Sequence, residues 1–311
     1  MPPPAIPADR SSTPGTSTDR SSVSTASRRP LLDPCNDFVF KVLFVRQPAL
    51  LLHLVNAVRD HLPPVADIEI LNPAIPPEAI AGKTIVLDIL ARDRIGQRFN
   101  VEMQIRRQPA LPKRSVFYLG RITSGQLEIG AHYASLAPVI GIHLLDFTWF
   151  RDHPRKACWR FVLRDDKSGD VLPDAPLELN LLELPKADRL GENDRDAPLF
   201  AWVTFFKHAQ EPDIMSRIEY PPVREAMATL AQISEDDQAR LNAEARKRAL
   251  MDQAALVDEA RSEGEQKGLA EAAQNIARQL IDQLGLDDAT IARLTGLSEA
   301  DVERLRGQAA D

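Results

Sequence analysis

Residues 85–104 read IVLDILARDRIGQRFNVEMQ, and this stretch decides the fold. It holds two apolar, alternating runs, and the segment between them, residues 93–97, carries the Asp and Gly residues typical of a turn. Such a pattern predicts a β-hairpin. Because side chains alternate along a strand, we expect Glu102 and Gln104 on one face of the second strand and Val101 and Met103 on the other.

Each strand of the predicted hairpin carries one acid, Asp88 in the first and Glu102 in the second. Neighbouring strands lie about 5 Å apart, so the two carboxylates can converge on one divalent cation. The backbone carbonyl of Met103 is a candidate third oxygen ligand. A bound Mg²⁺ or Mn²⁺ supplies the charge neutralisation and the activated water that phosphodiester hydrolysis needs. The hairpin therefore predicts a metal-dependent phosphodiesterase.

The order of the other predicted elements indicates an α/β fold, with a mixed central sheet flanked by helices. Residues 36–60 are apolar at helical spacing, and Pro48 should divide them into two helices. The remaining expected elements are a short strand over 67–71, the hairpin, a long helix over 111–136, a central strand over 138–147, and two further strands over 159–163 and 177–184.

The helix expected over 111–136 has an apolar side and a basic side. Its expected buried residues are Val116, Leu119, Ile122, Leu127, Ile129 and Tyr133. The segment 105–127 contains no acid and carries five cations, Arg106, Arg107, Lys113, Arg114 and Arg121. Arg114 and Tyr118 are four residues apart and share a face. A positive stripe beside the acids suits a DNA backbone, and a solvated helix face is the alternative.

Composition excludes several classes of protein. The formal net charge of −7 argues against a generally basic nucleic-acid binder. Two cysteines, Cys35 and Cys158, fit neither a disulfide framework nor a zinc site, so we expect a cytoplasmic protein. Residues 1–30 are rich in Pro, Ser and Thr and contain no apolar run, which predicts a disordered arm and no membrane segment.

We divide the chain into the arm (1–30), a nuclease-like domain (31–212, core 31–150) and an acidic helical tail (213–311). The tail has 12 basic and 20 acidic residues, and Gly264 and Gly268 are expected to interrupt it. Residues 286–305 predict two short helices, with Gly296 in the turn and Ser298 as a cap. Because acids outnumber bases there, we expect a hairpin for packing or homo-oligomerisation and not a DNA-reading helix-turn-helix.

Several short segments between Asp33 and Phe150 resemble the Rpn family of recombination-promoting nucleases, often described as transposases, within the PD-(D/E)XK superfamily. The matching residues are Asn36-Asp37-Phe38, Phe40-Lys41, Leu43-Phe44, Gly82-Lys83, Leu87-Asp88-Ile89, Asn100-Val101-Glu102-Met103-Gln104, Arg114, Tyr118, Gln126, Gly130, Tyr133 and Pro138-Val139-Ile140. The resemblance implies an αβββαβ restriction-endonuclease-like core and a Mg²⁺-dependent DNA endonuclease that promotes recombination. It further implies that Asp88 and Glu102 bind the metal.

In that comparison Gln104 takes the catalytic position of the superfamily lysine. An amide does not titrate near neutral pH, so Gln104 can orient a water but cannot act as a general base. A nearby cation, Arg106 or Arg114, can substitute electrostatically. The departure leaves a second interpretation open, a catalytically weak or inactive DNA-binding relative of mobile-element origin.

A third interpretation, a helical interaction protein whose hairpin acids are surface residues, is disfavoured. Asp88 interrupts an apolar strand, and burying an unpaired carboxylate costs several kcal/mol. Asn36 or Asp37 can cap the first helix, and for Asp37 we expect a cap in preference to a metal ligand. The isolated histidines His53, His132 and His143 are expected to be core or surface residues and not ligands.

Overall fold

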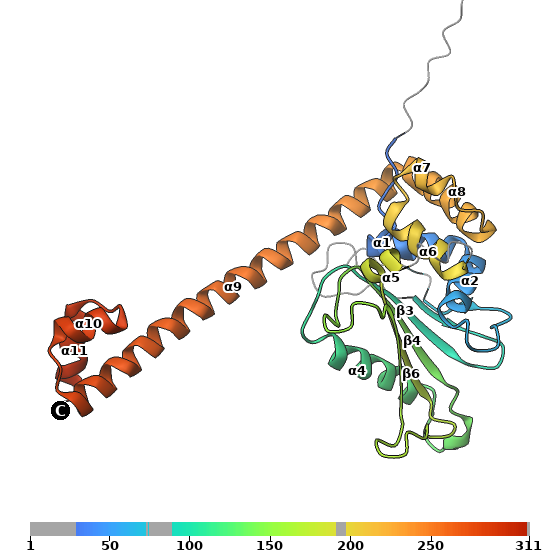
Figure 1. Cartoon of the computed structure of the whole chain (residues 1–311). Helices are drawn as coiled ribbons and strands as arrows, with labels where there is room; N and C mark the ends of the chain where they lie inside the picture. Colours follow the sequence, from blue (N-terminus) through green and yellow to red (C-terminus); the bar gives the residue numbers. More distant parts are fainter. Residues whose placement is uncertain (1–28, 73, 75–88, 191–196, 310–311) are drawn as a thin grey trace, which may run out of the picture.

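A computed structural model of the chain describes residues 29–72, 74, 89–190 and 197–309 (Figure 1). Asp88, the Gly82-Lys83 pair and nearly all of the expected N-terminal arm lie outside these residues.

A six-stranded mixed sheet forms the centre of the domain, with strand order β1-β2-β3-β4-β6-β5. The strands are β1 (Glu69–Ile70), β2 (Ile89–Arg92), β3 (Arg98–Gln104), β4 (Val139–Leu145), β5 (Cys158–Val162) and β6 (Leu177–Glu183). β3, β4 and β6 run parallel, and the other pairs are antiparallel. The expected hairpin, central strand and two further strands are all confirmed.

The hairpin of β2 and β3 has the register that the alternation predicts. Ile89 pairs with Val101, and both are fully buried. Its turn is held by the side chain of Asp93, whose Oδ1 accepts from the backbone N–H of Ile95 and of Gln97. Gly96 adopts a φ of 90°, a conformation that favours glycine. The turn therefore fixes which residues of β3 face each side of the sheet.

One face of the sheet is covered by helices that share a single apolar core (Figure 1). The helices of the described residues up to 235 are α1 (Asp37–Arg46), α2 (Pro48–Val58), α4 (Leu111–Ser124), α5 (Leu184–Leu190), α6 (Pro198–His208), α7 (Pro212–Met215) and α8 (Pro221–Glu235), with a 3₁₀ turn at Tyr133–Ser135. Asn36 caps α1 by accepting from Phe38 and Val39, and Pro48 begins α2, as the sequence predicted. Val101 and Met103 of β3 lie in this core.

The opposite face carries α4, which is shorter than expected. The helix ends at Ser124 instead of continuing to residue 136. Leu111, Ser115 and Leu119, which are four residues apart on the helix, are its buried positions. Of the residues expected to be buried, Leu119 is confirmed and Ile122 and Leu127 are partly buried, whereas the expectation was wrong for Val116, Ile129 and Tyr133, which are exposed. One helix on an open sheet buries only a narrow stripe.

The apolar core continues past residue 212, where we divided the domain from the tail. Val223, Leu230 and Ile233 of α8 are fully buried in the same core as the sheet and α1. Ala239 and Ala243, at the beginning of the next helix, belong to it as well. Cutting the chain at residue 212 would remove part of the core.

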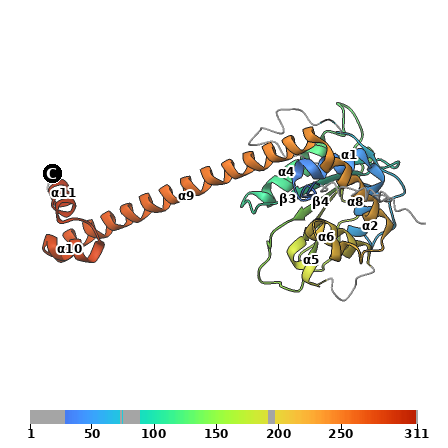
Figure 2. The same ribbon diagram turned by 90° about the horizontal axis from the view of Figure 1, so that it is seen from above.

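A single helix, α9 (Asp237–Leu284), extends from the domain to a small helical unit at the far end (Figures 1 and 2). Its 48 residues correspond to about 70 Å at 1.5 Å per residue. Gly264 and Gly268 do not interrupt it, contrary to expectation. Each glycine lowers the stability of the helix by about 1 kcal/mol relative to alanine, and the strong helix formers around the two glycines offset this loss.

At the far end, the last turns of α9 pack with α10 (Asp288–Thr295) and α11 (Glu299–Ala309). The unit has its own small core, made of Ala277, Ile291, Ala292, Val302 and Leu305. Gly296 ends α10 with a φ of 75°, and the hydroxyl of Ser298 accepts from the backbone N–H of Asp301. The two short helices, the turn and the cap are confirmed.

No single helix in the described ranges has the length and apolar character needed to cross a membrane. The pair α1 and α2 meets those criteria only when joined, across a bend of 111°.

Candidate active site

Glu102 lies in the middle of the sheet face that α4 covers, and two amides hold its carboxylate. Asn100 Nδ2 donates to Oε1 at 2.8 Å, and Gln104 Nε2 donates to Oε2 at 2.7 Å. The three residues alternate along β3, so they share one face, as predicted. All three are buried, with Glu102 only 4% exposed. The two amide donors orient the carboxylate and offset part of the cost of burying it.

His143 of β4 is the direct partner of Glu102 across the parallel pair. Its Nε2 lies 3.9 Å from Glu102 Oε1, and its Nδ1 lies 3.2 Å from Ser115 Oγ of α4. Burial lowers the pKa of His143; the negative charge of Glu102 opposes that shift and the positive charge of Arg114 adds to it. His143 is thus a buried histidine, as expected, but it belongs to the site.

Two buried acceptors in this cluster have no hydrogen-bond partner among the described residues, His143 Nε2 and Asn100 Oδ1. Unpaired buried polar atoms are uncommon and call for an explanation. Together with Glu102 they form a nitrogen and oxygen donor set that fits a divalent cation. Within the described ranges no group of three or more His, Cys, Asp or Glu residues gathers in this way, so the set depends on a further ligand.

Asp88, the expected first ligand, lies outside the described residues. It is bonded to Ile89, whose strand partner Val101 precedes Glu102. Met103 directs its side chain into the core on the other face. The metal-binding roles of Asp88, Glu102 and Met103 stay predictions.

The basic stripe follows directly on the carboxyl end of β3. Arg106 and Arg107 lie in the loop, and Lys113, Arg114 and Arg121 lie on α4. No salt bridge joins any of the five to a described carboxylate. In open α/β sheets, ligands bind outside the carboxyl ends of the parallel strands, which is where this stripe begins.

Two members of the stripe, Arg107 and Arg114, have local contacts. The Arg107 guanidinium lies 4.9 Å from the centre of the Trp149 ring, and Arg114 lies 6.0 Å from that of Tyr118. Arg114 also donates to Gln108 Oε1 at 2.6 Å. The positive charge of Arg114 contributes to the lowered pKa of His143, after burial, which is the main cause. The DNA-binding roles of Arg106, Arg107, Lys113, Arg114, Tyr118 and Arg121 remain predictions.

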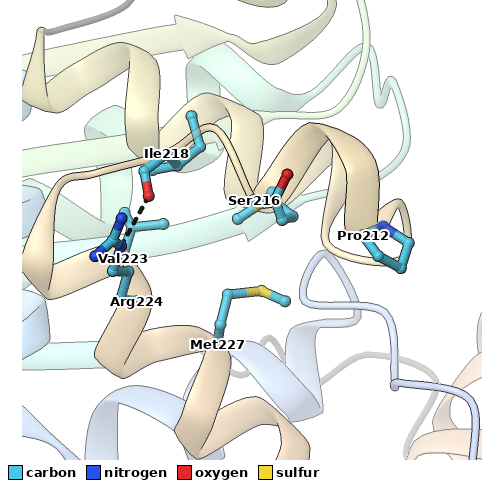
Figure 3. A pocket seen from close by; sticks show the side chains of 7 residues that line it. Pro212, Ser216, Ile218, Val223, Arg224 and Met227 are labelled. Carbon is cyan, nitrogen blue, oxygen red and sulfur yellow. Dashed lines mark hydrogen bonds between the residues drawn. The ribbon is translucent and has the colours of Figure 1, made fainter.

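Two surface hollows lie outside the Glu102 cluster, apart from Ser115, which lines the second of them. One, of about 310 Å³, lies between α7 and α8, and its Arg224 donates to the carbonyl oxygen of Ile218 at 3.0 Å (Figure 3). The other, of about 440 Å³, lies between α4 and the β5–β6 edge, and its lining contains no Lys or Arg. Neither lining includes Glu102.

Comparison with known proteins identifies the fold. Residues 34–260 match the model of the family described as PD-(D/E)XK nuclease family transposase. The chain belongs to this PD-(D/E)XK family. Residues 270–307 match a second model, the C-terminal HTH domain of the Rpn/YhgA-like nuclease family. No curated protein and no solved structure matched. The resemblance to Rpn nucleases and the restriction-endonuclease-like fold are confirmed.

The second match corrects our expectation for the C-terminal helices of this PD-(D/E)XK protein. We expected a helical hairpin for packing or self-association and not a DNA-reading helix-turn-helix, because acids outnumber bases in residues 286–305. The unit formed by the end of α9, α10 and α11 is instead a helix-turn-helix domain of the Rpn/YhgA-like type. Charge predicts affinity for phosphates but does not define a fold, which here depends on the apolar core and the Gly296 turn.

Sequence reasoning missed Asn100, Ser115 and His143 as members of the site. The sequence does indicate Asn100, because Asn100, Glu102 and Gln104 alternate with apolar residues along the strand and so share a face. It indicates His143 too, as the single ionisable residue of an apolar strand. It does not indicate Ser115, which only the packing of α4 brings to His143.

Proposed function

We propose that this PD-(D/E)XK protein is a divalent-metal-dependent DNA endonuclease that promotes recombination. The observation that carries the proposal is the carboxylate of Glu102, buried and oriented by Asn100 and Gln104 beside a basic stripe. A buried carboxylate contributes nothing to apolar packing, and burying it lowers the stability of the fold. A role in metal binding accounts for a carboxylate in this position.

Each part of the site has a task in this proposal. Asp88 and Glu102 hold Mg²⁺ or Mn²⁺, and the Met103 carbonyl is a third candidate ligand. The bound cation supplies Lewis-acid stabilisation of the phosphate charge and lowers the pKa of a water. Gln104 orients Glu102, and Arg114 adds positive charge in place of the missing lysine.

The stripe of Arg106, Arg107, Lys113, Arg114 and Arg121, with Tyr118, contacts the DNA backbone. Contacts to phosphates position the duplex without selecting sequence. The C-terminal helix-turn-helix offers a second contact with DNA at the other end of α9, and α9 offers a surface for homo-oligomerisation.

One observation favours a second candidate function, a weak or inactive DNA-binding relative. Gln104 carries no charge where the superfamily has a lysine, and Glu102 is almost fully covered. Such a protein would bind DNA without cutting it.

Cleavage of supercoiled plasmid tests the proposal. We expect cutting with Mg²⁺ or Mn²⁺, none with EDTA, and a loss of about 100-fold or more in Asp88→Asn and Glu102→Gln. Asp93→Asn is the matched control, since it removes a carboxylate from the same hairpin but keeps the turn acceptor. Full activity of Glu102→Gln contradicts the assignment. Metal-independent DNA binding without cleavage by the wild type supports the second candidate.

A further inference from the structure

The hydrogen bonds of Ser115 determine which nitrogen of His143 carries a proton. The Ser115 hydroxyl donates its only hydrogen to the Leu111 carbonyl oxygen at 2.9 Å. Its oxygen can therefore only accept from His143, 3.2 Å away, so Nδ1 of the imidazole is protonated. Nε2 is left with a lone pair, on the side of the ring that faces Glu102.

Two acceptors thus face each other in the centre of the protein. His143 Nε2 and Glu102 Oε1 lie 3.9 Å apart, and Nε2 has no donor among the described residues. His143 is 1% exposed and Glu102 4% exposed, so bulk water does not separate them. Two facing lone pairs repel at low dielectric unless a positive charge lies between them.

The spacing of these atoms suits a cation shared by both. Divalent ions hold nitrogen and oxygen ligands at about 2.1 Å, so two ligands of one ion lie roughly 3 to 4 Å apart. A histidine that binds metal normally donates its other ring N–H to a fixed acceptor, which sets the tautomer and the ring orientation. Ser115 is such an acceptor.

We propose that His143 is a nitrogen ligand of the cation held by Glu102, so that the site prefers a transition-metal ion such as Mn²⁺ over Mg²⁺. The proposal rests on the metal dependence proposed above and adds a ligand from β4. Mg²⁺ demands oxygen ligands in near-ideal octahedral geometry, whereas transition-metal ions accept imidazole. Replacing one oxygen ligand by nitrogen therefore shifts the preference.

Electron spin-echo modulation of the Mn²⁺-loaded full-length protein tests this ligand directly. We expect ¹⁴N coupling from a directly bound nitrogen in the wild type, and its replacement by ¹⁵N coupling when the histidines are ¹⁵N-labelled. The coupling should be absent in His143→Gln and unchanged in His53→Gln, which removes an exposed imidazole in α2. Bound Mn²⁺ without histidine coupling in the wild type overturns the proposal, whether or not the variant folds.

Competition between Mn²⁺ and Mg²⁺ gives a second readout. His143→Gln should weaken Mn²⁺ binding by about tenfold or more and Mg²⁺ binding much less, and Ser115→Ala should weaken Mn²⁺ binding by about tenfold because the ring loses its orientation. Equal losses for both ions contradict the proposal. If metal binding depends on Glu102 but not on His143, only this inference fails. If Glu102→Gln leaves binding unchanged, the proposed function fails with it.

Discussion

Asp37 of α1 and Arg246 of α9 form a buried ion pair, with Arg246 Nη2 2.7 Å from Asp37 Oδ2 and Nε within 3.0 Å of both carboxylate oxygens. The two residues are 209 positions apart in the chain. Of the two residues expected to cap α1, Asn36 and Asp37, it is Asn36 that takes the cap position. Asp37 instead joins the first helix of the domain to the beginning of the long helix.

Asp37→Ala should destabilise the protein by about 3 to 5 kcal/mol, because it breaks a buried ion pair by removing the carboxylate that contacts the Arg246 guanidinium. Urea denaturation of both proteins measures the difference. Glu265→Ala is the control, since its pair with Arg261 is exposed on α9 and should contribute less than about 0.5 kcal/mol. An equal effect of the two substitutions would show that the buried pair is dispensable.

Truncation after residue 248 should leave a folded domain, whereas truncation after residue 212 should not. The shorter chain lacks Val223, Leu230 and Ile233, and each buried aliphatic side chain contributes about 1.5 to 3 kcal/mol. Circular dichroism melting and solution mass measurement distinguish the two. A cooperative melt of the 1–212 chain would mean that the core is complete without α8 and that α8 only covers its surface.

The 1–248 chain should also bind non-specific DNA at least as tightly as the full chain, even though it lacks the helix-turn-helix that we propose as a second DNA contact. Residues 249–311 contain 13 acidic and six basic residues, so their removal lowers repulsion of phosphates. A DNA titration on both chains checks this. Weaker binding by the folded fragment would assign the affinity to the C-terminal helix-turn-helix.

Gln104→Lys should keep or increase cleavage. A lysine amine can donate to Glu102 Oε2 as the amide does, and it adds positive charge where negative charge develops on the phosphate. Gln104→Ala, which removes the donor, should lower activity. Plasmid cleavage by both variants is the measurement. Complete loss in Gln104→Lys, with normal folding and metal binding, would show that the amide itself is required.

Replacing Arg106, Arg107, Lys113 and Arg121 by Ala should weaken DNA binding for all sequences alike. Each lost phosphate contact should reduce the slope of log affinity against log salt by about 0.9. The matched control removes four exposed cations from α9, Arg248, Arg261, Lys267 and Arg278. If the control flattens the slope as much as the stripe variant, the long helix and not α4 contacts the backbone.

His208 should make the stability of the domain depend on pH. Burial by itself lowers its pKa, but hydrogen bonds to Glu211 at 2.7 Å and Asp188 at 2.8 Å raise the pKa above 6.5 overall. The stabilisation is complete below pH 6.5 and is lost as pH rises through the folded pKa. His208→Gln should therefore lose more stability at pH 6 than at pH 8.5. A pH-independent loss, or an equal one in exposed His132→Gln, would contradict this.

Local patterns in the sequence were enough to predict most of the sheet. The alternation in residues 85–104 has the period of a strand, the apolar run in β4 has the length of a central strand, and Pro48 begins α2 and Gly296 ends α10 through their own backbone preferences. Glu102 and Gln104 share a face because the period of a strand is two. These properties depend on neighbours in the chain, so the sequence by itself determines them.

Tertiary structure decided the contacts between residues that are far apart in the sequence. The parallel pairing of β3 with β4 brings His143 beside Glu102, and the packing of α4 brings Ser115 to His143. Leu119 was predicted correctly as buried but Val116 was not, because burial depends on the surface that covers a helix as well as on its own period. Asp37 meets Arg246 only because α9 begins against α1. Contacts of this kind arise from packing across the whole domain, which no local pattern encodes.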